Sequence, residues 1–209
     1  ELSHLTNFSN NGNEIAFGTI GDASTSEGIF WESINAACVL EIPVVMSVWD
    51  DGYGISVPKK YQTTKESISK ALAGFEIEED SNGLKIFRCK GWNYQELYST
   101  YKEATEFTRV NHKPSLVHVE EITQPQGHST SGSHERYKSE NRLKWEKEND
   151  CNLKFRSWII DNNIATEADL EAIETSTQQE AKKAKENAWE ASLEPIRNEA
   201  RQLASCCLL

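Results

Sequence analysis

Several features that define other protein classes are scarce or missing in this chain of 209 residues. No apolar run approaches the roughly 20 residues that cross a bilayer, and no basic head precedes an apolar stretch at the start. We therefore expect neither a membrane span nor a secretory leader. Lysine and arginine number 22 against 33 acidic residues, a net charge of −11. This balance disfavours nucleic acid and anionic membrane surfaces as partners.

Cysteine is present, but in no pattern that makes a site. The five cysteines include no C-x-x-C pair and are odd in number. We expect free thiols without a metal or redox role, in a reducing, cytoplasmic setting. The chain begins at Glu1 and has no initiator methionine, so we expect a piece of a longer protein.

Short apolar runs alternate with helical stretches through the first two thirds of the chain. We expect strands at 15–20, 44–49, 84–89 and 115–120, and helices at 26–41, 64–75 and 94–111. Strands that alternate with helices predict an α/β fold with a parallel sheet, whose ligands bind beyond the carboxyl ends of the strands.

Two parts follow from this pattern. Residues 1–138 are expected to form the α/β domain, which lacks its N-terminal part. Residues 139–209 are expected to form a helical C-terminal extension, exposed and rich in Ala, Glu and Lys. Within it, Thr166 followed by early acidic residues predicts the start of a long helix.

The most informative segment, GDASTSEG at 21–28, follows the first expected strand. Gly21 offers backbone angles closed to other residues. Ser24 and Glu27 have capping-box spacing, so a helix should begin near Ser24 and direct its first amides at a phosphate. Asp22 lies at the same edge and would repel a phosphate, unless a divalent cation bridges the two.

A second acidic turn, Asp50-Asp51-Gly52-Tyr53-Gly54, follows the next expected strand. Adjacent parallel strands end side by side, so Asp51 is expected close to Asp22, with the carbonyl of Tyr53 as a further oxygen ligand. Each turn alone is ordinary turn chemistry. Together they favour a metal–diphosphate site.

Gly21-Asp22, 28 intervening residues and then Asp51 with GYGISVP resemble the thiamine-diphosphate motif. The run GDASTSEGIFWESINAACVLEIPVV, the segment PSLVHVEEIT and the loop Gly127-His128-Ser129-Thr130-Ser131 resemble the alpha subunit of the 2-oxo acid dehydrogenases. The resemblance implies a three-layer αβα thiamine-diphosphate-binding fold. It also implies decarboxylation of pyruvate or a branched-chain 2-oxo acid, with transfer of the acyl group to lipoamide.

The resemblance assigns roles by position. Three residues would bind Mg²⁺ by side chain or carbonyl: Asp22, Asp51 and Tyr53. The residues expected at thiamine diphosphate are Gly21, Ala23, Ser24 and Ile55, together with those three ligands. His128 would reach the reactive side of the cofactor and act on the substrate as the catalytic residue, which suits its pKa. We expect no role for His4, His112, His118 and His134.

The resemblance also implies groups outside this chain. The glutamate that activates the cofactor would come from a beta subunit or a fused beta domain, and the acyl acceptor would be the lipoyl-bearing acyltransferase core. We expect an oligomer, and weak cofactor binding without turnover by the isolated chain. Ser129 and Ser131 lie where mitochondrial relatives are phosphorylated, and the residues here give no separate reason to expect that regulation.

The chain departs from the family pattern at the candidate site. Asp50-Asp51 replaces Asn-Asn, Ala23 replaces the third glycine of GDG, and Gln124-Pro125-Gln126 lacks the arginine that usually precedes the loop. These departures leave open a non-catalytic module that kept the fold. A transketolase-like transferase is a further alternative, which the GHS loop and the helix at SEGIFWESINAA disfavour.

Overall fold

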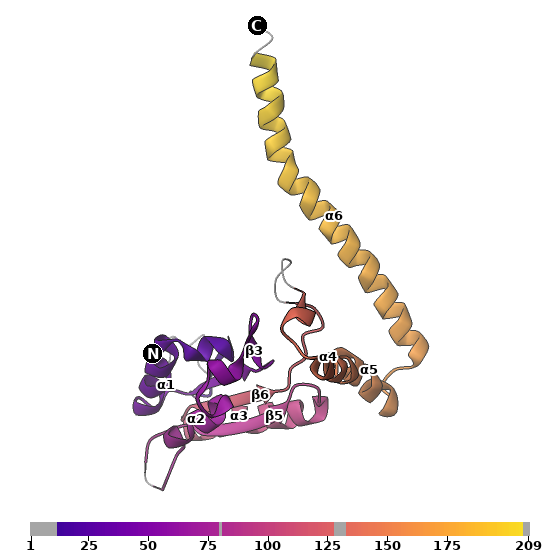
Figure 1. The fold of residues 1–209 in the computed structure, drawn as a ribbon. Coiled ribbons are helices and arrows are strands. Elements are labelled where there is room, and N and C mark those ends of the chain that lie inside the picture. Colours follow the sequence, from indigo (N-terminus) through magenta and orange to yellow (C-terminus); the bar gives the residue numbers. More distant parts are fainter. Residues whose placement is uncertain (1–11, 80, 128–132, 207–209) are drawn as a thin grey trace. The chain divides into compact units, whose positions relative to one another are not determined.

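The computed structural model describes residues 12–79, 81–127 and 133–206, in two compact units, Glu1–Phe155 and Arg156–Leu209. The first unit contains a parallel sheet (Figure 1). Its strands lie in the order β1 (Ala16–Gly21), β2 (Val44–Trp49), β6 (Ser115–Glu120) and β5 (Lys85–Lys90). The four predicted strands and the α/β class are therefore confirmed.

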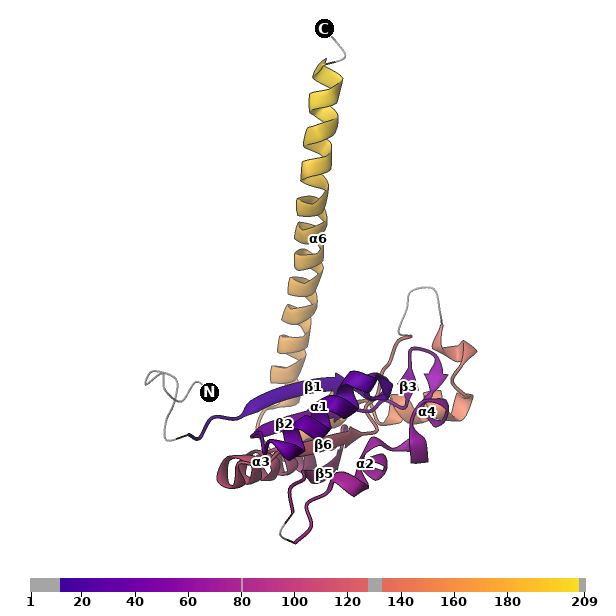
Figure 2. The same ribbon diagram turned by 90° about the vertical axis from the view of Figure 1, so that its left-hand side faces the viewer.

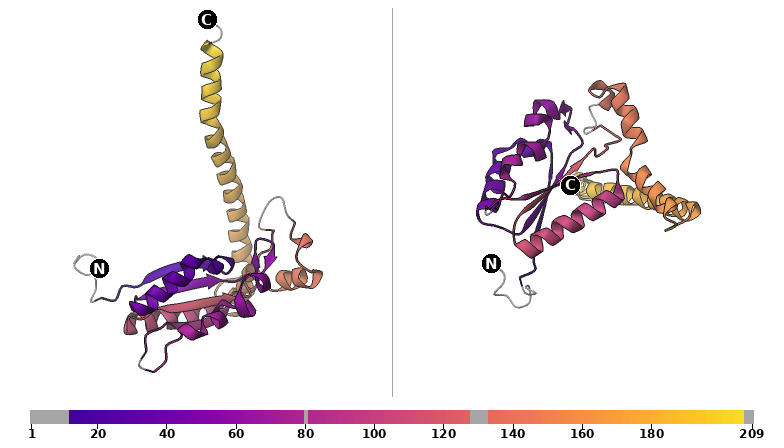
Figure 3. Two further views of the ribbon diagram at one scale, coloured as in Figure 1. Left: turned by 60° about the vertical axis from the view of Figure 1, so that its left-hand side comes forward. Right: turned by 90° about the horizontal axis from the view of Figure 1, so that it is seen from below.

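Helices cover both faces of this sheet (Figure 3). On one face, α1 (Gly28–Val39) and α2 (Ile68–Ala71) bury Phe30 and Ile68 with Val48 of the sheet. On the other, α3 (Tyr94–Asn111) buries Ala104 against Val45 and its neighbours. Apolar residues thus point to both sides of the strands, as a sheet enclosed by helices requires. The predicted three-layer αβα arrangement is confirmed.

The helix expected at 64–75 is wrong over most of its length. Only α2 is α-helical there, between the short 3₁₀ segments η3 (Thr64–Glu66) and η4 (Ala73–Phe75). Lys65 and Glu66 have φ angles of 60° and 51°, and Ser67 is extended. An α-helix cannot pass through left-handed residues, so the chain turns before α2 begins.

The residues beyond the two central strands make the turns that matter for the site. They form η1 (Ala23–Ser26), the hairpin of β3 (Tyr53–Gly54) and β4 (Val57–Pro58), and η2 (Lys59–Tyr61). Further along, η5 (His134–Arg136) precedes α4 (Glu140–Glu148), whose N-cap Ser139 accepts a hydrogen bond from the Arg142 amide. These segments fill the carboxyl-end side of the sheet.

The C-terminal part of the chain is helical, as predicted, and the domain boundary expected after residue 138 stays a prediction. The chain continues through α5 (Cys151–Asp161) to α6 (Glu167–Cys206), a helix of 40 residues (Figure 2). Thr166 accepts the Asp169 amide proton at 3.2 Å, and the Asp169 carboxylate accepts from the Thr166 amide and hydroxyl. This reciprocal cap confirms the expected start of α6. In the part of the chain that the structure describes, none of the helices combines the length and the hydropathy that a membrane span requires.

Candidate cofactor and metal site

Main-chain hydrogen bonds join the ends of three neighbouring strands. The amide of Asp22 donates to the carbonyl of Trp49 at 3.0 Å, and the amide of Asp50 donates to the carbonyl of Val119 at 2.9 Å. The amide of Ile122 in turn donates to the carbonyl of Asp50 at 3.0 Å. The turns after β1, β2 and β6 therefore begin side by side at the carboxyl-end edge of the sheet. Open α/β sheets bind their ligands at this edge.

The turn after β1 differs from the sequence prediction in its details. Gly21 is extended within β1 and has no positive φ, and a Cβ atom built on it would meet nothing within 4 Å. Its contribution is open space at the strand end, so the expected need for special backbone angles is wrong. This space suits the close approach of a bound diphosphate.

The expected capping box at Ser24 is also wrong. Ser24 makes no side-chain cap, and α1 begins only at Gly28, after the 3₁₀ turn η1. The reason is Thr25, which is buried and donates its hydroxyl to the carbonyl of Asp22 at 2.5 Å. This bond and the Thr25 amide at 3.1 Å tighten the chain into 3₁₀ geometry before the α-helix starts.

The carboxyl group of Asp22 is buried and incompletely paired. The residue is only 6% exposed, and its Oδ2 atom has no hydrogen-bond partner. Burial, together with repulsion from Asp50 and Asp51, raises the pKa of Asp22 to about 7. An unsatisfied buried oxygen costs stability and needs an explanation, of which an ion is one. A divalent cation would satisfy Oδ2 and offset the repulsion between the three acids.

Asp50, one residue beyond β2, has the opposite environment. Its Oδ2 accepts from Lys59 Nζ at 2.7 Å and lies 2.9 Å from His118 Nε2, while its Oδ1 accepts from the Gly52 amide at 2.8 Å. Burial acts to raise the pKa of Asp50, but His118 and Lys59 outweigh it and lower the pKa to about 2. Asp50 is thus an ionised carboxylate whose two oxygens both have hydrogen-bond partners.

The turn that carries Asp51 and Tyr53 is held on its outer side by the segment at α4. The Tyr53 amide donates to Asp51 Oδ1 at 3.0 Å, and Arg142 Nη2 donates to the Asp51 carbonyl at 2.7 Å. The Tyr53 ring contacts Tyr137, and Lys138 Nζ and the Arg142 guanidinium lie 5.1 and 5.5 Å from its centroid. Figure 2 shows β3 beside α4.

Burial also raises the pKa of Asp51, with a further contribution from Asp50, against the Tyr53 amide and the charges of Lys138 and Arg142. The neighbouring Glu146 is 4% exposed and binds both cations: Lys138 Nζ lies 2.8 Å and Arg142 Nε 2.8 Å from its Oε1. These ion pairs orient Arg142, whose hydrogen bond to the Asp51 carbonyl joins α4 to the turn.

The turns after β1 and β2 touch each other. A Cβ atom on Gly54 would lie 2.8 Å from the Ala23 methyl group, too close for any residue but glycine. Ser26 Oγ also donates to the carbonyl of Gln62 at 3.0 Å. The methyl group of Ala23 is therefore accommodated because residue 54 has no side chain. Ile55 follows with φ 58° and is 58% exposed, a strained conformation for a β-branched residue.

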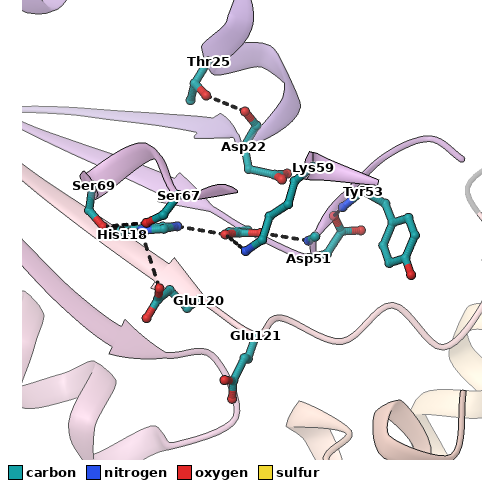
Figure 4. A network of polar contacts seen from close by, with 12 residues as sticks. Asp22, Thr25, Asp51, Tyr53, Lys59, Ser67, Ser69, His118, Glu120 and Glu121 are labelled. Carbon is teal, nitrogen blue, oxygen red and sulfur yellow. Dashed lines mark hydrogen bonds and ion pairs between the residues drawn. The ribbon is translucent and has the colours of Figure 1, made fainter. Parts of the chain in front are cut away.

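The described residues fit the predicted metal–diphosphate site in several respects. Figure 4 shows Asp22, Asp51 and Tyr53 on the same side of the strand ends. In the part of the chain that the structure covers, no three His, Cys, Asp or Glu side chains converge to hold a metal by themselves. The predicted ligand set is not of that kind. It has two carboxylates and one main-chain carbonyl, and phosphate oxygens of the cofactor would complete the coordination of Mg²⁺.

Sequence reasoning missed the residues that support these turns. His118 was expected to have no role, yet it is fully buried against Asp50. Lys59, Arg142 and the Lys138–Glu146 pair belong to other segments, and no local pattern marks them. The only local sign is the acidic pair itself, because a buried carboxylate needs a cation or several donors. His128, Ser129 and Ser131 lie outside the described residues.

Comparison with known proteins agrees with the motif. The family model described as "Dehydrogenase E1 component" matches residues 5–196. A pyruvate dehydrogenase E1 component subunit alpha from Rickettsia conorii is 31% identical over 177 residues, 85% of this chain and 52% of the relative. A 2-oxoisovalerate dehydrogenase subunit alpha 2, mitochondrial, from Arabidopsis thaliana is 32% identical over 155 residues, 72% and 31% of the two chains.

A 2-oxoisovalerate dehydrogenase subunit alpha from Bacillus subtilis is 28% identical over 153 residues, 73% of this chain and 44% of the relative. The chain spans about half the length of the Rickettsia relatives that it matches. The family match covers nearly the whole sequence and includes both acidic turns. The chain belongs to the dehydrogenase E1 component family.

Proposed function

We propose that this chain is the diphosphate- and Mg²⁺-binding part of a thiamine-diphosphate-dependent 2-oxo acid dehydrogenase. The whole protein would decarboxylate pyruvate or a branched-chain 2-oxo acid and transfer the acyl group to lipoamide. The observation that carries the proposal is the unpartnered, buried Oδ2 of Asp22, at the strand edge where Asp51 also lies. The names of the relatives support the reaction class.

The residues of this chain would bind and orient the cofactor. Asp22, Asp51 and the Tyr53 carbonyl would hold Mg²⁺, and Mg²⁺ would hold the diphosphate. The surfaces of four more residues would line the cofactor: Gly21, Ala23, Ser24 and Ile55. Thiamine diphosphate would supply the electron sink that decarboxylation of a 2-oxo acid requires. The acidic departure at Asp50 does not oppose this, because Lys59 and His118 already engage that carboxylate.

The remaining roles need groups beyond those described. His128 is the proposed catalytic residue at the substrate. A beta subunit or fused beta domain would supply the activating glutamate, and the lipoyl-bearing acyltransferase core would accept the acyl group. We propose an oligomer that places the cofactor between alpha and beta parts. A cytoplasmic location stays a prediction.

The test is a calorimetric titration of the full-length protein, with its beta part, using thiamine diphosphate in Mg²⁺ or in EDTA. We expect Mg²⁺-dependent binding by the wild type and its loss in Asp22→Ala, because that change removes a metal ligand. Asp161→Ala, which changes an exposed carboxylate of α5, is the matched control and should bind normally. Absence of Mg²⁺-dependent binding in the wild type would refute the proposal and favour the non-catalytic module.

The substrate class needs a separate assay. Turnover with pyruvate or branched-chain 2-oxo acids and a lipoyl acceptor is expected. Turnover only with a ketose donor and an aldose acceptor would instead identify a transketolase-like transferase.

A further inference from the structure

A buried polar network lies directly behind the turn that carries Asp51 and Tyr53 (Figure 4). Its centre is Asp50, which is 1% exposed. Lys59 Nζ and His118 Nε2 lie 2.7 and 2.9 Å from Oδ2, and the amide of Gly52 donates to Oδ1 at 2.8 Å. Each carboxylate oxygen of Asp50 is therefore already bonded within the protein.

The network extends deeper through His118. The imidazole is 0% exposed, and its Nδ1 lies 2.9 Å from Ser69 Oγ, which lies 3.1 Å from Ser67 Oγ. Asp50 follows β2, Lys59 belongs to η2, His118 to β6 and Ser69 to α2. Both ring nitrogens of His118 have a partner. Groups from η2, β6 and α2 therefore fix the position of the Asp50 carboxylate.

The Gly52 amide links this network to the candidate metal site. Gly52 has φ 85°, and the next two residues are Tyr53, which contributes its carbonyl, and Gly54, which packs on Ala23. Asp50 Oδ1 therefore holds the peptide between Asp51 and Gly52. Metal ligands are oriented by such hydrogen-bonded neighbours, whose loss weakens metal affinity.

We propose that Asp50, held by Lys59 and His118, is a positioning residue that fixes the Asp51–Tyr53 turn for Mg²⁺ and is not itself a metal ligand. This inference rests on the proposed function of the site. It assigns the first acid of the Asp50-Asp51 pair to support and the second to coordination. Lys59 has a further effect, because its ammonium group balances the negative charge that Asp50 would otherwise add beside Asp22.

The first test is Lys59→Met in the full-length protein with its beta part, titrated with Mg²⁺ and thiamine diphosphate. We expect Mg²⁺-dependent binding to weaken about tenfold, because Asp50 loses one of its three partners. Cofactor binding by Lys59→Met as tight as that of the wild type, or tighter, would mean that the hold of Lys59 on Asp50 does not position the turn, and the proposal would be wrong. Lys60→Met, which changes the adjacent exposed lysine, is the matched control and should bind as the wild type does.

The second test is a double-mutant cycle with Asp50→Asn. The amide oxygen of Asn can still accept from Gly52, but its NH₂ group would face the Lys59 ammonium. We expect Asp50→Asn to weaken binding about tenfold or more, and Asp50→Asn with Lys59→Met to recover part of that loss. A metal-ligand role for Asp50 predicts instead equal or greater loss in the double variant.

Amide hydrogen exchange in metal-free protein separates this inference from the proposed function. Asp50→Ala should accelerate exchange of the Gly52 amide about tenfold or more, since its acceptor is removed, while Lys60→Met should not. Unchanged exchange would overturn the positioning role even if the wild type binds cofactor. Accelerated exchange in a protein that shows no Mg²⁺-dependent binding would instead refute the proposed function and, with it, the metal role of the turn.

Discussion

The ends of β1 and β2 offer a comparison between two buried aspartates. Asp22 and Asp50 each follow their strand by one residue, and they are 6% and 1% exposed. Asp50 has three side-chain and main-chain donors, whereas Oδ2 of Asp22 has none. Their pKa values shift in opposite directions, to about 7 for Asp22 and about 2 for Asp50.

The role of each buried aspartate therefore depends on its hydrogen-bonding and ionic partners, since residue type and burial are nearly the same at both positions. Burial by itself acts to raise the pKa of both groups. At Asp50, Lys59 and His118 more than offset burial, and the carboxylate becomes part of the framework. At Asp22, the neighbouring charges are other carboxylates, so the ionised group stays unstable until a cation arrives. An unpaired carboxylate such as that of Asp22 is suited to binding a metal ion. It lowers the stability of the protein when no metal is bound.

The same substitution at Asp22 and at Asp50 should have very different effects on stability. Asp50→Ala should lower the free energy of unfolding by about 3 kcal/mol, because Gly52, Lys59 and His118 lose their acceptor. Asp22→Ala should leave stability unchanged or raise it by about 1 kcal/mol, because an unsatisfied oxygen is removed. Urea denaturation in EDTA at pH 8 measures both, and equal losses would contradict the assignment.

A smaller effect is expected on the pH dependence of stability in EDTA. The pKa of Asp22 is about 7 in the folded state and near 3.8 when unfolded, so the folded state holds the extra proton between these values. The stabilising contribution is full below pH 4 and is lost as pH rises through about 7. Asp22→Asn should remove this decline. The decline should also disappear in saturating Mg²⁺ and thiamine diphosphate, and its persistence in Asp22→Asn would assign it to another group.

A weaker effect is expected from Arg142 of α4, which contacts the turn that carries Asp51 and Tyr53. Arg142→Lys keeps the charge but loses the planar group that reaches both Glu146 and the Asp51 carbonyl, so Mg²⁺-dependent cofactor binding should weaken less than tenfold. Lys144→Ala is the control and should bind cofactor as the wild type does. The Lys144–Glu148 pair is exposed and should contribute less than about 0.5 kcal/mol to the stability of the fold. An effect of Arg142→Lys as large as that of Asp50→Asn would mean that α4, not the buried network, sets the turn.

Local pattern predicted most of the fold. The central strands β2 and β6 are buried on both faces and consist mostly of apolar residues, so their signal is strong and needs no long-range information. The helix expected at 64–75 failed because Lys65 and Glu66 take left-handed conformations that their residue types do not announce. The capping box at Ser24 failed because Thr25 bonds to Asp22 instead.

The two acidic turns and their place at neighbouring strand ends follow from the amino-acid pattern alone, because strand alternation and parallel pairing bring those ends together. Which carboxylate lacks partners and which one is hydrogen-bonded depends on contacts that form when the chain folds. Lys59, His118 and Arg142 reach the turns from η2, β6 and α4, at separations of 9, 68 and 91 residues from their partners. Electrostatic and hydrogen-bond energies depend on distance in space, and separation along the chain does not reveal that distance.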